Sequence, residues 1–181
     1  LHPHPEDNAI AAMHLNVERA LEASGIEATF LRPGGFDSNA LGWAQAVKTA
    51  GAVDLPYPNG ELSVIHEADI ADAALAVLTT PALRGKAYRL TGPESLTGAE
   101  QVAVIGKAAD RPIAVNHVGP EEWKASVSGF LPPALADALL ALAAETDGRP
   151  DTVTDAVEEL TGHPARTFAE WADENADAFR P

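Results

Sequence analysis

The chain has 181 residues, of which 46% are hydrophobic and 22% charged, enough apolar material for one globular domain. It carries 12 Lys and Arg against 27 Asp and Glu, and the net charge of −15 argues against nucleic acid or an anionic membrane as partner. The absence of Cys excludes disulfides, thiolate metal sites and thiol nucleophiles. No apolar run approaches ~18 residues, so no membrane span is predicted, and we expect a cytoplasmic protein.

The first predicted element is a helix over residues 8–24, where apolar side chains recur at steps of three and four residues. Asn8 or the Asp before it is the expected N-cap, and Gly25 is the expected end. Residues 26–31 predict a short buried strand that stops at a Pro-Gly-Gly sequence. The next helix is predicted to have Ser38 as its cap.

Extended segments and one helix occupy the middle of the chain. Residues 53–57 and 62–65 flank an Asn-Gly pair, which is typical of a reverse turn. Asp69 is the predicted N-cap of a helix that ends before a proline. A strand over residues 87–90 follows that helix.

Helices predominate in the rest of the chain. Thr97 and Glu100 have the spacing of a capping box, and Pro120 suits the first position of a further helix. A strand is predicted between them at residues 113–118, and helices follow over residues 131–144, 153–160 and 168–179. Strands and helices alternate first and helices follow, which predicts an α/β fold with a helical C-terminal part.

One stretch of the chain has a recognisable sequence, because residues 14–36, HLNVERALEASGIEATFLRPGGF, resemble the central signature of the NmrA-like family. Three further matching stretches follow in the family's order: HEADIA at residues 66–71, YRLTGPE at 88–94 and ELTGHPARTF at 159–168. NmrA-like proteins are atypical short-chain dehydrogenase/reductase relatives that bind NAD(P). The resemblance therefore implies an oxidoreductase or redox sensor whose cofactor, in the complete protein, is NADP or NAD.

The resemblance also implies the architecture. We expect the C-terminal part of a Rossmann-like doubly wound sheet, formed by residues 1–50 and 62–92, and a small, mostly helical substrate-binding lobe, formed by residues 51–61 and 93–181. Family members begin with a strand and a glycine-rich turn that holds the pyrophosphate, and this sequence contains no such pattern. We therefore expect the resemblance to cover only the C-terminal two-thirds of a member, and this chain alone not to bind a dinucleotide tightly.

An incomplete sheet would leave the strand containing Phe30 and Leu31 at an exposed edge. We expect that edge to be covered either by a missing N-terminal segment or by a second copy of the chain in a homodimer. The expected ligand of the whole assembly is a small molecule.

The resemblance places His14 and Glu18 where hydride-transferring short-chain dehydrogenases have Tyr and Lys. In those enzymes Lys lowers the pKa of the phenol, and Tyr passes a proton to the developing alkoxide. A carboxylate at the Lys position would repel the phosphates of a dinucleotide. His14 as a general base oriented by Glu18, four residues later on the same helix face, is one interpretation. A surface ion pair is the other.

The expected ligand-binding residues lie after the strand that precedes the Pro-Gly-Gly sequence. Ligands of open α/β sheets bind outside the carboxyl ends of the strands, so Pro33, Gly34, Gly35 and Phe36 are expected to line a pocket, next to the nicotinamide in the family. The candidate substrate-binding residues are Asn39, Trp43 and His66. A pure packing role for Trp43 is the alternative.

No set of His, Asp and Glu has a convincing metal-ligand spacing, and His2 and His4 in the proline-rich N-terminus are discounted. Two other functions remain open. One is a cofactor-independent isomerase, cyclase or lyase that uses His14 or His66 as acid–base. The other is a non-enzymatic regulatory binding protein, which the loss of the Tyr and Lys pair favours.

Overall fold

The structure is a computed structural model and describes residues 8–181. Its α-helices are α1 Ala9–Ser24, α2 Ala44–Ala50, α3 Glu67–Thr79, α4 Gly98–Ala108, α5 Pro120–Val127, α6 Pro133–Glu145, α7 Ala156–Thr161 and α8 Phe168–Glu174. Its strands are β1 Phe30–Pro33, β2 Ala52–Leu55, β3 Glu61–Leu62, β4 Ala87–Leu90, β5 Leu96–Thr97 and β6 Ala114–His117. Short 3-10 helices are Asp37–Trp43, Pro81–Leu83 and Ala176–Ala178. The chain thus has the expected α/β fold, with parallel strands and Rossmann-like architecture.

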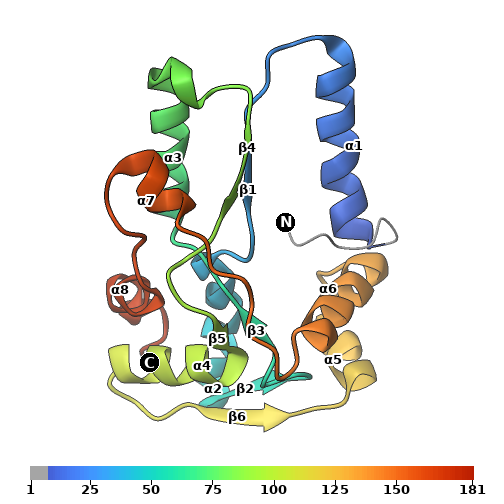
Figure 1. Ribbon diagram of the computed structural model, residues 1–181. Coiled ribbons are helices and arrows are strands. Elements are labelled where there is room, and N and C mark those ends of the chain that lie inside the picture. Colours follow the sequence, from blue (N-terminus) through green and yellow to red (C-terminus); the bar gives the residue numbers. More distant parts are fainter. Residues whose placement is uncertain (1–7) are drawn as a thin grey trace.

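The parallel pair β1–β4 forms the centre of the first half of the molecule (Figure 1). Helices α3 and α7 lie on one side of this pair and α1 lies on the other. Ile65, Leu90 and Val157 are buried between the strands and the α3–α7 side. In the described residues, β1 has a strand partner on one edge only.

The second half is built around two more strand pairs, the parallel pair β2–β6 and the short antiparallel pair β3–β5. Helices α4 and α8 pack with these strands into a second core. Trp171 is buried there, stacked on Phe168 at a ring distance of 5.5 Å and edge-on to Phe179 at 6.4 Å. Within residues 8–181, no helix is both long enough and apolar enough to cross a membrane.

Helix boundaries that depend on local chemistry are confirmed. The Asn8 side chain accepts hydrogen bonds from the first-turn backbone of α1, and Gly25 ends that helix in the left-handed conformation with φ 74°. The capping box of Thr97 begins α4, and the one of Thr167 begins α8. Pro120 stands at the start of α5, as predicted.

Several expected boundaries and caps are wrong. The strand expected over 62–65 is limited to Glu61–Leu62, and the helix expected over 168–179 ends at Glu174. The strand expected over 26–31 begins only at Phe30, because its partner β4 begins at Ala87 and earlier residues have nothing to pair with. Ser38 does not cap a helix, since the 3-10 turn starts one residue earlier without a side-chain cap. Asp69 is not the N-cap of α3, because the His66 ring takes that place and accepts from the Ala68 N–H.

The apolar stripe of α1 is only partly covered. Met13 and Val17 lie on the expected buried face, yet they are 60% and 58% exposed, and Ile26 beyond the helix is 64% exposed. Asn8 connects the start of α1 to α6, and Glu18 connects the helix to β1. Helix α1 is therefore held at few points and presents apolar surface.

Candidate functional site

A tight corner from Pro33 to Phe36 links the end of β1 to the following 3-10 helix. The Gly34 N–H donates to the Leu90 carbonyl at 3.3 Å, and the Gly35 carbonyl accepts from the Ile65 N–H at 2.9 Å. A Cβ at Gly35 would lie 3.2 Å from a Val64 methyl group. Glycine at this position therefore lets the corner pack closely on the neighbouring segment.

The corner borders a cavity of about 250 Å³, called the corner cavity below. His14 reaches it from an exposed position on α1, and Arg89 and Asp151 form another part of its wall. The residues that line it are Asn8, Ile10, His14, Pro33, Gly34, Gly35, Phe36, Asn39, Leu62, Arg89, Leu139, Leu142 and Asp151. The sequence-predicted residues His14, Pro33–Phe36 and Asn39 are thus brought together around one hollow.

A second cavity, of about 410 Å³, adjoins the first and is called the aromatic cavity. Phe36, Asn39, Leu62 and Leu139 line both. The further residues that line it are Ala40, Trp43, Leu55, Pro56, Tyr57, Gly60, Val64, Gly98, Gln101, Trp123, Leu140 and Ala143. Trp43 also packs on the core, so the cavity and packing interpretations both apply to it.

Glu18 binds Arg32 and does not orient His14. The Arg32 Nε and Nη2 donate to the two carboxylate oxygens at 2.9 and 2.6 Å, so both oxygens are engaged in a bidentate pair. Hydrogen bonding to Arg32 is the main cause of the lowered pKa of Glu18, and His14 contributes only a minor attraction. His14 remains a candidate acid–base, without the expected carboxylate behind it.

Arg89 and Asp151 were not singled out from the sequence. The Arg89 Nη2 donates to Asp151 Oδ1 at 2.9 Å, across 62 residues of sequence. The other Asp151 oxygen accepts from the Ser63 N–H at 2.9 Å and the Ser63 hydroxyl at 2.7 Å. The strand alternation of Tyr88, Arg89 and Leu90 was the available signal, since it places Arg89 on the face opposite two residues that pack in the core.

His66 lies away from both cavities, and its ring is engaged by the protein. Nδ1 accepts from the Ala68 N–H at 3.1 Å, which leaves the proton of the neutral ring on Nε2, 3.2 Å from a Glu174 oxygen. The ring is buried. These contacts assign His66 to the start of α3 and do not aim it at a ligand.

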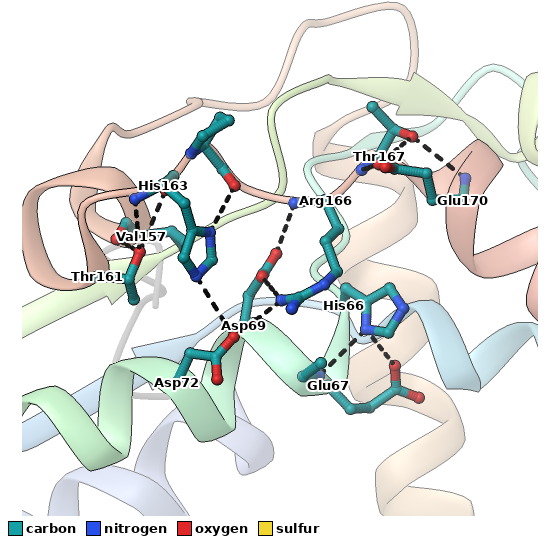
Figure 2. Close-up of polar contacts among 12 residues, drawn as sticks. His66, Glu67, Asp69, Asp72, Val157, Thr161, His163, Arg166, Thr167 and Glu170 are labelled. Atoms are coloured by element: carbon teal, nitrogen blue, oxygen red, sulfur yellow. Dashed lines mark hydrogen bonds and ion pairs between the residues drawn. The ribbon is translucent and has the colours of Figure 1, made fainter.

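Asp69 holds the C-terminal segment onto α3 (Figure 2). It accepts from the Arg166 N–H at 2.7 Å and also binds the Arg166 guanidinium, which reaches Asp72 at 3.0 Å. Asp69, Asp72 and His163 have ligand atoms within 4.8 Å of one another. Because the guanidinium already binds both carboxylates, this cluster is an ion-pair network. His2 and His4 lie outside the described residues.

Asp37 is a buried carboxylate directly after the corner. Its side chain is 1% exposed, and neither oxygen has a hydrogen-bond partner among the described residues. Burial, with smaller contributions from Glu67 and Asp69, raises the pKa of Asp37 to about 7. Its position next to Phe36 was visible in the sequence, but its burial was not.

The residues present fit one end of a dinucleotide only. The corner backbone, Asn39 and His14 surround a hollow at the carboxyl end of β1, where ligands of such sheets bind. The sequence contains no glycine-rich phosphate-binding turn. The resemblance to the family implies that this hollow receives the nicotinamide end of the cofactor.

Comparisons with known proteins identify the family of the chain. The chain is 40% identical over 166 residues to an NAD(P)H azoreductase of Xenophilus azovorans, covering 90% of this chain and 57% of the azoreductase. It is 36% identical over 165 residues to a (4-alkanoyl-5-oxo-2,5-dihydrofuran-3-yl)methyl phosphate reductase of Streptomyces griseus, covering 91% of this chain and 58% of that reductase. The chain thus spans less than two-thirds of these relatives.

A solved structure gives the same result. An NADPH-dependent quinone oxidoreductase of Escherichia coli in complex with NADPH superposes with a TM-score of 0.78 at 29% identity, covering 92% of this chain and 59% of that chain. The family model described as "NmrA-like family" matches residues 7–172. The chain therefore belongs to the NmrA-like family, whose homologues include NAD(P)H-dependent reductases.

Proposed function

We propose that this chain supplies the substrate lobe and the nicotinamide-side wall of an NAD(P)H-dependent reductase of small conjugated molecules. The observation that carries the proposal is the pair of adjoining cavities at the Pro33–Phe36 corner, one bordered by His14 and the other by aromatic side chains. Flat aromatic walls favour planar, conjugated substrates. Relatives named for azo, quinone and oxo-dihydrofuran reduction support this class.

The division of labour follows from the residues. The bound cofactor supplies hydride. The corner backbone would position the ring end of that cofactor, and Asn39, Trp43 and Trp123 would hold the substrate. His14, which lines the corner cavity, would deliver the proton that the substrate takes up together with the hydride.

A separate segment supplies the phosphate-binding turn. One edge of β1 has no strand partner among residues 8–181, and Met13 and Val17 on α1 are exposed. Both support this, because unpaired strand edges and apolar helix faces are normally covered. A homodimer that pairs the same edges is the competing arrangement. The division into a Rossmann-like part and a substrate lobe, and the cytoplasmic location, stay predictions.

The decisive experiment compares this chain with the product of the longest reading frame that contains it. NADPH fluorescence is titrated against both, and turnover is followed with methyl red and menadione as azo and quinone acceptors. We expect NADPH binding and turnover only in the product that carries a glycine-rich segment. Failure of such a product to bind NADPH would overturn the proposal.

The role of His14 has its own test. A His14→Gln variant should keep NADPH affinity and lose turnover by about 100-fold, the usual scale of general acid–base catalysis. His163→Gln is the matched control, because His163 contacts Asp72 far from the cavities. Unchanged turnover in His14→Gln would remove His14 from the mechanism.

A cofactor-independent isomerase, cyclase or lyase is the second candidate. It is favoured by the same observation, a His at a formed cavity that needs no other segment. Turnover of a substrate by this chain without NAD(P)H would establish it. A non-enzymatic regulator would instead show nucleotide binding with no turnover of any acceptor.

A further inference from the structure

Arg89 stands beside Arg32 on the face of β4 that looks toward α1. The parallel register pairs Arg32 with Arg89, while Tyr88 and Leu90 turn to the opposite face and pack in the core. Two neighbouring guanidinium groups on one sheet face repel each other, so each needs a partner. Arg32 binds Glu18 and Arg89 binds Asp151, and the two contacts use different numbers of guanidinium donors.

Arg32 is fully engaged. Its Nε and Nη2 form a bidentate pair with Glu18, which uses the guanidinium edge that faces α1. Arg89 is bound through Nη2 to one Asp151 oxygen, and among the described residues no other hydrogen bond is made by its side chain. With five N–H donors on a guanidinium, Arg89 retains donors for a ligand.

Asp151 is held in place by several hydrogen bonds besides the one from Arg89. Besides Arg89, its oxygens accept from the Ser63 N–H and hydroxyl and from the Thr152 N–H at 2.6 Å, and its side chain is 6% exposed. A carboxylate with this many donors stays ionised and holds its position. Asp151 therefore acts as a rigid support that fixes the Arg89 guanidinium.

Arg89 is the permanent cation among the described residues that line the corner cavity, and its side chain is 23% exposed. Leu62 lines both the corner cavity and the aromatic cavity, so the two cavities adjoin at this residue. A ligand with an anionic group and a flat apolar body would place its anionic group at Arg89 and its apolar body between the aromatic side chains of the aromatic cavity. Guanidinium groups bind phosphate and carboxylate by paired hydrogen bonds.

We infer that Arg89 is the specificity-determining residue of the substrate site and binds an oxyanionic substituent, a phosphate monoester or a carboxylate, of an otherwise apolar substrate. The inference rests on the proposed function in that the aromatic cavity holds the apolar body of the substrate, and the part of the corner cavity near Arg89 holds its anionic group beside the cofactor's ring end. The net charge of −15 opposes long-range attraction of anions, so recognition is by local hydrogen bonds.

The test is calorimetric binding of three small probes to the chain without NADPH: phenyl phosphate, benzoate and neutral benzyl alcohol. Phenyl phosphate or benzoate should bind at least about tenfold more tightly than benzyl alcohol, the scale of one hydrogen-bonded charged contact. Arg89→Met should abolish this preference and leave the affinity for benzyl alcohol unchanged. Lys86→Met is the matched control, since it removes one exposed positive charge near the start of β4.

Arg89→Met leaves the buried Asp151 carboxylate without its cation and for that reason can fail to fold. The double variant Arg89→Met with Asp151→Asn removes both charges and is measured alongside it. A further probe is adenosine 2′-phosphate, which represents the phosphate of NADPH and tests whether Arg89 binds the cofactor instead of the substrate. Arg89-dependent binding of this nucleotide without that of the aryl anions would overturn the inference, as would an unchanged anion preference in the folded double variant. Either result leaves the NADPH experiment above untouched.

Discussion

Replacing Asp37 by Asn should change how stability depends on pH. The Asp37 carboxyl is buried next to Phe36, and its pKa is raised from 3.8 to about 7, mainly by burial and then by Glu67 and Asp69. The charge of Asp69 is compensated by Arg166, whereas Asp37 has no hydrogen-bond partner in the described part of the chain. Ionised Asp37 is therefore unfavourable in the folded state.

The direction in which stability changes with pH follows from the number of protons bound in the folded and unfolded states. Between pH 3.8 and about 7 the folded chain keeps the Asp37 proton and the unfolded chain has lost it, so stability falls as pH rises through this interval. A pKa difference of about 3 units at 1.36 kcal/mol each corresponds to about 4 kcal/mol, fully lost above the folded-state pKa.

Asp37→Asn removes this titration and keeps the shape of the side chain. The free energy of unfolding, from urea titrations followed by circular dichroism between pH 4 and 8.5, should match wild type near pH 4. It should exceed wild type by as much as about 4 kcal/mol at pH 8. Asp173→Asn is the matched control, because Asp173 is exposed on α8. Parallel pH profiles for Asp37→Asn and wild type would refute the reasoning.

Three further changes test the fold. Arg166→Met leaves the buried Asp69 carboxylate without its cation and should lower the free energy of unfolding by about 3 to 5 kcal/mol; a loss below about 1 kcal/mol would contradict the ion-pair assignment. Gly92→Ala places a Cβ 2.0 Å from a backbone oxygen and should destabilise the chain by about 3 kcal/mol or more, whereas Gly34→Ala, with no atom within 4 Å, should be tolerated; equal melting temperatures would count against the packing described. Thr97→Ala removes a helix cap and should cost about 1 kcal/mol in urea unfolding, with no change expected only if the capping box is not formed.

Features that depend on near neighbours were predictable. Asn8 and Thr97 cap helices through backbone groups two or three residues away, and Gly25 ends α1 because it tolerates a positive φ. The Pro-Gly-Gly corner was readable for the same reason, since it breaks a strand by its own backbone preferences.

Features that depend on distant pairing were not predictable. Asp69 has the residue type of a cap, but its partner Arg166 lies 97 residues further on. The start of β1 is decided by where β4 begins, and the Arg89–Asp151 pair spans 62 residues. Local sequence patterns contain no information about which distant segment a side chain will meet.

His14 and Glu18 stand at the positions of the family's Tyr and Lys, and the structure shows what the negative charge of Glu18 binds. A Glu at position 18 predicted repulsion of the dinucleotide phosphates, because an isolated carboxylate is negative at neutral pH. The Arg32 contacts lower the pKa of Glu18, so the carboxylate stays ionised but forms a pair of zero net charge. The pair therefore weakens the electrostatic objection to a nucleotide at the corner cavity, where we propose proton transfer by His14 and anion binding by Arg89.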